Sequence, residues 1–140
     1  YYIPHHQKLT DAVEESLLAN DYCLIIDGHG FPALPLPNEL NQTAFRPDFC
    51  LGTDDFHTPE ELVAKVEKIF EICGYSTARD QPFSGSIVPI KHYQKDQRVQ
   101  SLMIEINRWL YLGGDYSVDS ERTKTLVSVL RRVAEGLEDN

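Results

Sequence analysis

The sequence predicts an α/β layered fold, in which strands alternate with helices. Two observations indicate this class. Short apolar runs of strand length alternate along the chain with longer segments whose apolar residues recur at helical spacing. The run at 22–26 is also apolar throughout, which is typical of a strand covered on both faces.

The first helix is expected over residues 4–20, where Leu9, Val13 and Leu17 form an apolar stripe. The strand at 22–26 follows it. Asp27-Gly28-His29-Gly30 then stands where the strand ends, and open α/β sheets place their ligands at such ends.

A proline-rich loop is expected over residues 31–47, and loops of this length are commonly functional. A short strand at 48–52 comes next. The second helix is predicted to begin at Thr58 as N-cap, with Glu61 completing a capping box. Gly74 supplies its end.

Two more strands are expected at 75–78 and, briefly, at 87–88, where Pro89 ends the segment. A polar loop then leads into a strand near residue 101. The last helix is predicted to start near residue 119 or 120. We expect the 140 residues to form one domain or part of one.

The strand near residue 101 carries the first candidate for chemistry. Leu102, Ile104 and Ile106 would point to one face, and Glu105 to the other. Burying a carboxylate is costly, so Glu105 needs a partner such as a cation, a metal-bound water or a substrate. A glutamate on a solvated sheet face is the alternative.

Composition limits the classes of partner. The net charge is −9, and the sequence contains no stripe of basic residues, so nucleic acid and anionic membranes are not expected to bind. No apolar run approaches the roughly 20 residues of a membrane span. The three cysteines lie within or beside apolar runs, as buried free thiols do, and this predicts a reducing, cytoplasmic setting.

His29 is the second candidate. An imidazole between two glycines at a strand end suits a metal ligand or a general base, and a plain turn histidine is the alternative. His57 and Glu60 have a zinc-like spacing, but the acidic residue is equally explained by a helix N-terminus. Four arginines, Arg46, Arg79, Arg98 and Arg108, stand where they could bind an anion, or could pair with nearby acids.

Several motifs in order resemble the N-formylglutamate amidohydrolase family. They are the segment after the 22–26 strand, residues 46–54 with 57–59, the 82–85 turn, and residues 96–98 leading into 103–108 and Tyr111. The resemblance covers roughly residues 2–111. It implies a fold similar to that of the zinc carboxypeptidases, a three-layer α/β/α domain with a mixed, mostly parallel sheet.

The resemblance also implies the chemistry. One zinc ion would be held by His29, and Glu105 would be the general base that activates the zinc-bound water. Arg46 or Arg98 would help to stabilise the oxyanion. Arg46, Arg98 and Arg108, with Asn107, would hold the carboxylates of a small anionic acyl-amino acid, with N-formyl-L-glutamate as the first substrate expected.

Two departures from the family pattern bear on these expectations. Gly28 and Gly30 stand where the family carries cysteine and serine, and loss of a hydroxyl there would weaken support of His29. The first zinc ligands of the family come from an upstream segment, so we expect the chain to be the C-terminal portion of a larger amidohydrolase domain. The alternatives are another acyl-amino acid or peptide as substrate, or a binding protein with a decayed site.

Overall fold

The computed structural model describes residues 2–43 and 46–138. Its centre is a sheet whose strands are ordered β1-β4-β2-β3. The strands are β1 (Cys23–Phe31), β2 (Phe49–Gly52), β3 (Thr77–Arg79) and β4 (Val99–Asn107). The β1–β4 and β2–β3 pairs are parallel and the β2–β4 pair is antiparallel. The sheet is therefore mixed and mostly parallel, as the family resemblance implies.

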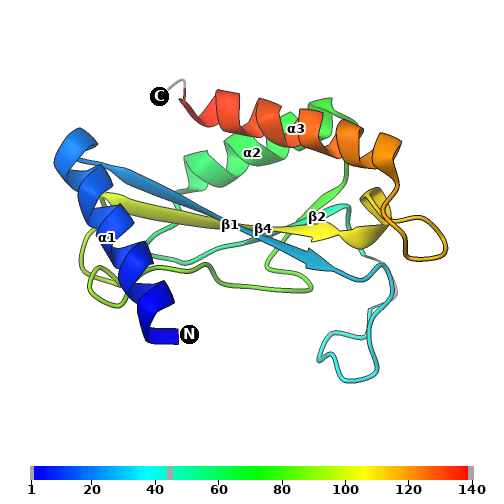
Figure 1. Cartoon of the computed structure of the whole chain (residues 1–140), viewed down its shortest axis with the longest axis horizontal. Helices are drawn as coiled ribbons and strands as arrows, with labels where there is room; N and C mark the ends of the chain where they lie inside the picture. The colour runs from blue at the N-terminus through cyan, green and yellow to red at the C-terminus, as the bar shows by residue number, and fades with distance from the viewer. Residues whose placement is uncertain (1, 44–45, 139–140) are drawn as a thin grey trace.

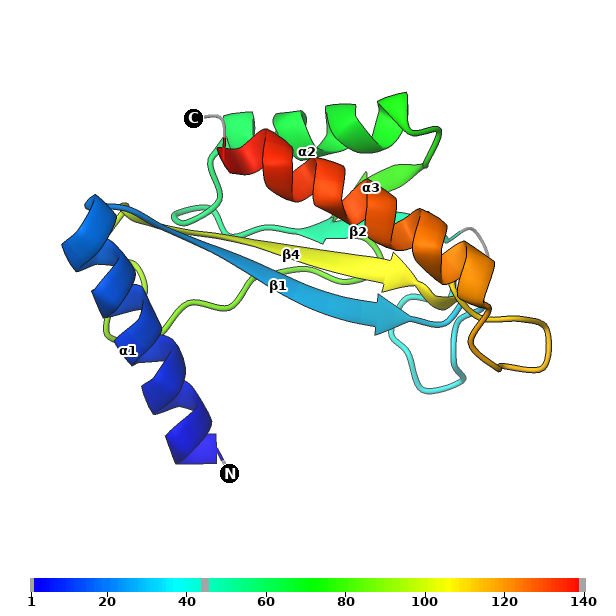
Figure 2. The ribbon, with the colours of Figure 1, turned by 45° about the horizontal axis from the view of Figure 1, so that its top comes forward.

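Helices lie on both sides of this sheet (Figures 1 and 2). Helices α2 (Glu60–Ile72) and α3 (Ser120–Glu138) cover one face side by side. Helix α1 (Tyr2–Asn20) packs near the start of β1 on the opposite side. A short 3₁₀ helix, η1 (Arg108–Leu110), follows β4 directly.

The main core lies between the sheet and the α2–α3 pair. Phe49 of β2 and Phe70 of α2 are fully buried there, with stacked rings whose centroids lie 3.9 Å apart. The predicted alternation of β4 is confirmed, because Leu102, Ile104 and Ile106 belong to this core. A smaller cluster joins α1 to the opposite face.

Strand β1 differs from its prediction in length and position. It continues through the Asp27–Gly30 segment to Phe31, so His29 lies within the strand and not in a loop after it. Its only ladder partner among residues 2–43 and 46–138 is β4, and Ile26 is 43% exposed. Backbone pairing with β4 extends a strand past its apolar run, because ladder hydrogen bonds do not depend on side-chain polarity.

The start of α2 also departs from the prediction. Pro59, not Thr58, flanks the helix, and no side chain caps it. The Thr58 hydroxyl instead donates to the Ser101 carbonyl at 2.6 Å and accepts from the Asp54 N–H at 2.9 Å. The hydroxyl joins the helix start to β4, which leaves it unable to cap.

Gly74 ends α2 with a φ of +84°, as expected for a helix terminator. The start of α3 at Ser120 is also confirmed. The expected strand at 87–88 is wrong, since these residues belong to no strand. Cys23 and Cys50 are buried free thiols, as predicted, and Cys73 is partly exposed.

Candidate functional site

Three side chains form a row across the sheet on the face away from α2 and α3. In the ladders, His29 of β1 is paired with Glu105 of β4, and Glu105 is paired with Cys50 of β2. Paired residues on neighbouring strands project to the same face, about 5 Å apart. The row lies near the carboxyl ends of β1 and β4, where open α/β sheets place ligands.

Glu105 is the buried acid of this row. The residue is 9% exposed, and its Oε2 atom is buried without a hydrogen-bond partner among the described residues. Burial raises the pKa of the carboxyl, and the nearby His29 partly offsets that effect. The solvated alternative for Glu105 is therefore wrong. A buried carboxyl with a raised pKa and a free oxygen is suited to accepting a proton.

His29 is oriented by Asp27, two residues earlier on the same strand. The Nε2 atom of His29 lies 2.9 Å from Oδ2 of Asp27, and the imidazole is about half exposed. This hydrogen bond is the main reason why the pKa of His29 is raised. It also leaves Nδ1 as the ring nitrogen that could bind a ligand.

Asp27 is a site residue that the sequence analysis did not assign. The signal was present, because residues two apart on a strand share a face. It was lost because the segment was expected to be a loop. The same alternation turns Gly28 and Gly30 to the opposite face, and the Tyr111 hydroxyl lies 2.9 Å from where a Cβ on Gly30 would stand. A side chain at position 30 would therefore meet Tyr111 rather than His29.

Arg46 and Asn107 lie at the same end of β4 as Glu105. The Asn107 side chain donates to the Pro47 carbonyl at 3.0 Å and accepts from the Trp109 N–H, so it anchors the chain beside Arg46 and caps η1. The Arg46 guanidinium pairs with Glu39 at 2.5 Å. Its Nε and Nη1 atoms are buried and have no partner among the described residues.

The other two arginines lie at opposite ends of β4. Arg108 donates to the Gly30 carbonyl at 3.0 Å and contributes to the electrostatics of Glu105. Arg98 precedes the first residue of the strand, where it is half exposed and pairs with Asp96 and Asp21. Glu105 lies seven positions further along the chain, which is roughly 23 Å at ~3.3 Å per residue of strand. The structure therefore does not bring Arg98 to this row.

The zinc-like spacing of His57 and Glu60 is explained structurally. His57 is fully buried, its Nδ1 lies 2.7 Å from the Val99 carbonyl, and its Nε2 accepts from the Gln94 N–H at 2.8 Å. Both ring nitrogens are thus occupied. Glu60 instead pairs with Arg79.

The residues present fit a metal ion only in part. Within residues 2–43 and 46–138, no group of three or more His, Cys, Asp or Glu side chains is arranged to hold one. A catalytic zinc site takes three protein ligands and keeps one position open. Of the side chains in the row, His29 could supply one metal ligand, because its Nε2 bonds to Asp27 and its Nδ1 is left to bind the ion.

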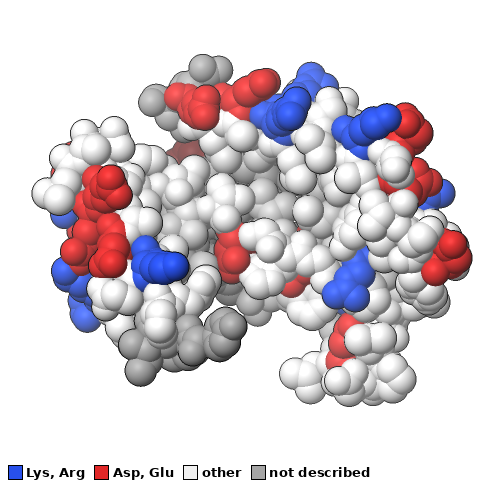
Figure 3. Space-filling view, in the orientation of Figure 1, with Lys and Arg blue, Asp and Glu red and all other residues white. Residues whose placement is uncertain are grey.

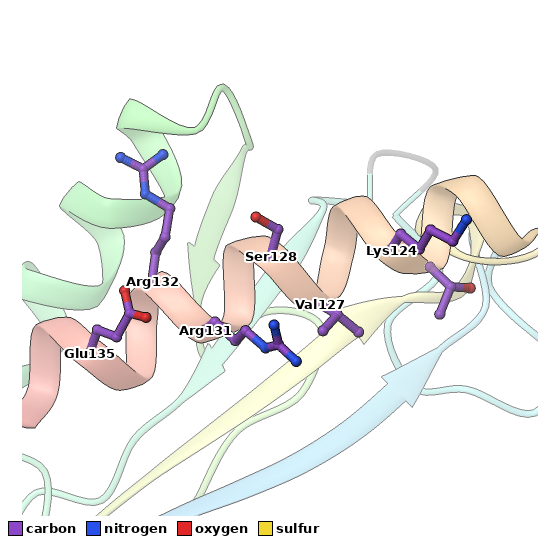
Figure 4. Close-up of a pocket in the computed structure, with 7 residues that line it drawn as sticks. Lys124, Val127, Ser128, Arg131, Arg132 and Glu135 are labelled. Carbon is purple, nitrogen blue, oxygen red and sulfur yellow. The ribbon is translucent and has the colours of Figure 1, made fainter.

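A groove on the other side of the molecule is distinct from this row. It follows the outer surface of α3, which covers the opposite face of the sheet, and has a volume of about 470 Å³ (Figure 4). Its lining mixes Lys124, Arg131 and Arg132 with Glu135 and Val127. Figure 3 shows charged side chains of both signs around the margin of the molecule and a largely uncharged middle.

A buried carboxyl thus lies beside a carboxylate-oriented imidazole at the carboxyl ends of two parallel strands, an arrangement suited to moving protons. The comparisons with known proteins identify the family. The model of the N-formylglutamate amidohydrolase family matches residues 1–112, and the chain belongs to this family. Comparison with curated proteins gave no match.

Two solved structures are similar in fold. One is the N-formylglutamate amidohydrolase from Ralstonia eutropha JMP134, with a TM-score of 0.70, 26% identity, and coverage of 100% of this chain and 54% of that one. The other is a gene product from Agrobacterium tumefaciens, with a TM-score of 0.65, 14% identity, and coverage of 98% and 50%. The chain thus spans about half the length of both neighbours.

Proposed function

We propose that this chain is part of an amidohydrolase that cleaves the formamide of N-formyl-L-glutamate to formate and glutamate. The buried carboxyl of Glu105, with one oxygen unpartnered, is the observation that carries the proposal. Family membership and the similarity to the Ralstonia enzyme support it. The substrate is small, and no helix among the described residues combines the length and apolar character that crossing a bilayer requires.

Glu105 acts as the general base. Its pKa is raised mainly by burial. A raised pKa makes the carboxylate a stronger base, and a general base works best when its pKa lies near the operating pH. It takes a proton from the water that attacks the formyl carbon. It then returns a proton to the departing amine, so that the C–N bond breaks and glutamate leaves as a neutral or protonated amine.

We also propose that the site works with zinc, which His29 would hold together with ligands outside the described residues. Zinc bound there would supply a Lewis acid and make water a better nucleophile near neutral pH. Asp27 holds the His29 ring in one orientation through the 2.9 Å contact, which keeps the other ring nitrogen available. Arg46 and Arg108 would bind the substrate.

Arg46 and Arg108 are the proposed ligands of the substrate carboxylates. Arg46 pairs with Glu39 through Nη2, and its other two donor atoms, Nε and Nη1, are buried without a partner among the described residues, which leaves them available to a carboxylate. Arg108 lies beside β1 through its bond to Gly30. The Asn107 side chain holds the Pro47 carbonyl, and so ties the segment that carries Arg46 to the end of β4 next to Arg108. Arg98 lies too far along β4 to take part.

The test is formate release by the full-length protein and its variant Glu105→Gln. We expect the variant to keep its metal and to lose at least about 100-fold in kcat, the usual contribution of a general base. Glu67→Gln is the matched control, because Glu67 pairs with Arg79 and lies on α2, which covers the other face of the sheet. Near-normal turnover in Glu105→Gln would remove Glu105 from the mechanism, and a panel of other acyl-amino acids would define the substrate range.

A further inference from the structure

The segment 82–88, named here the strap, runs over β2 and β4 on the face that carries Glu105. Three of its carbonyls mark the path. The Phe83 carbonyl accepts a hydrogen bond from the Cys50 thiol at 3.1 Å, and the Ile87 carbonyl accepts one from the Ser101 hydroxyl at 2.8 Å. Between them, the Gly85 carbonyl lies so close to Gly52 that a Cβ there would be 2.3 Å away.

These contacts place the strap in register with β4. Cys50 is the ladder partner of Glu105, and Gly52 is the ladder partner of Met103. Phe83, Gly85 and Ile87 thus lie level with residues 105, 103 and 101. The strap therefore runs antiparallel to β4 as a layer on the sheet, on the side away from α2 and α3 (Figures 1 and 2).

Phe83 crosses β4 at the level of the candidate site. Its carbonyl is held by Cys50 on β2, while its ring contacts the ring of Phe31 on β1, with centroids 5.7 Å apart. Strand β4 lies between β1 and β2. Phe31 is the ladder partner of Asn107, so Phe83 spans the strand between the levels of Glu105 and Asn107. The residue is partly exposed, which leaves part of it free to face a ligand.

We propose that Phe83 is a positioning residue that covers the Glu105 carboxyl from bulk water and forms an apolar wall of the substrate pocket. The proposal rests on the proposed function. Excluding water strengthens the electrostatic interactions of a site and holds its groups in place. Cys50 takes part by holding the Phe83 carbonyl, and the absence of a side chain at Gly52 lets the strap lie close to the sheet.

The test uses the full-length protein with Phe83→Ala and Phe83→Leu, and Phe70→Leu as the matched control. Phe70 is a buried phenylalanine on the opposite side of the sheet. Two quantities are measured: kcat and KM for N-formyl-L-glutamate, and the rate at which iodoacetamide alkylates Cys50, followed by peptide mass spectrometry. Cys50 is fully buried, so its alkylation reports whether the cover is open without requiring turnover.

We expect Phe83→Ala to raise the alkylation rate of Cys50 and to lower kcat, each by about tenfold or more, with a smaller change in KM. Phe83→Leu should have an alkylation rate of Cys50 and a kcat close to those of the wild type. Phe70→Leu should leave the alkylation rate and kcat unchanged. An alkylation rate in folded Phe83→Ala that equals that of the wild type would overturn the proposal. If Phe83→Ala does not fold, Gly52→Ala, which displaces the strap without altering Phe83, decides by the same two measurements.

The two proposals fail separately. A wild-type protein that releases no formate contradicts the proposed function, yet the alkylation ratio still decides whether Phe83 covers the row. A wild-type protein that releases formate, with Cys50 and kcat insensitive to Phe83→Ala, contradicts the role of Phe83 alone.

Discussion

Replacing Gly52 by alanine tests the packing of the strap on the sheet. A Cβ on Gly52 would lie 2.3 Å from the Gly85 carbonyl oxygen and 2.3 Å from the terminal methyl of Met103. The methionine end can rotate away, but the carbonyl belongs to backbone. Ordinary contact begins at 3.4 Å, so the strap must withdraw by about 1.1 Å, the difference between those distances.

The magnitude follows from the forced movement. Overfilling a packed interior costs about 1–3 kcal/mol. For a domain of this size, that lowers the Tm by roughly 3–12 °C. A displacement of about 1 Å at a catalytic site can also cost on the order of 100-fold in rate. The lower Tm and the lower rate both arise from the contact between the new Cβ and the Gly85 carbonyl oxygen, so they should appear together.

The assay is thermal unfolding followed by circular dichroism, with Gly28→Ala as the matched control. Gly28 lies in the same sheet, and a Cβ there would meet nothing within 4 Å. We expect Gly28→Ala to be neutral, or stabilising by up to about 1 kcal/mol. Equal Tm values for the two alanine variants would refute the argument that the strap lies tightly against Gly52.

Three further predictions concern charge and capping. Asp27→Asn should lower the pKa of His29 in the metal-free protein, as read by NMR titration, because the hydrogen bond from Asp27 is the main cause of its rise. A raised histidine pKa stabilises the fold below the unfolded value near 6.5 and loses that effect as the pH rises through the folded value, so Asp27→Asn should flatten this part of the Tm profile. Glu105→Gln should be more stable than the wild type at neutral pH, with a gap in Tm that opens as the pH rises above about 4.5, because burial raises the pKa of the native carboxyl. Asp119→Ala should lower the urea midpoint by an amount equivalent to about 1 kcal/mol, because Asp119 Oδ1 accepts from the Glu121 and Arg122 N–H groups at the start of α3.

The sequence predicted the elements that a strong local pattern defines. Alternation in β4 separated Leu102, Ile104 and Ile106 from Glu105, and that division is the one found. Helical periodicity also located α1, α2 and α3. Both patterns depend only on which face of an element is buried, and a single sequence records that directly.

The wrong predictions concern features that backbone pairing or a contact between distant residues determines. The extension of β1 through Gly28 and His29 comes from pairing with β4, which leaves no apolar signature. Thr58 has the sequence of a cap, yet its hydroxyl contacts Ser101, a residue of β4. Likewise, the path of the strap depends on Cys50 and Gly52, whose roles appear only once β2 lies beside β4.

We propose that Glu105 is the general base of an amidohydrolase site built on β1 and β4. The most direct test is a single measurement of formate release from N-formyl-L-glutamate by the full-length protein, with zinc content determined on the same samples of wild type and Glu105→Gln. We predict equal metal content in both and a loss of about 100-fold or more in turnover for the variant. Turnover by Glu105→Gln that matches the wild type would contradict the account.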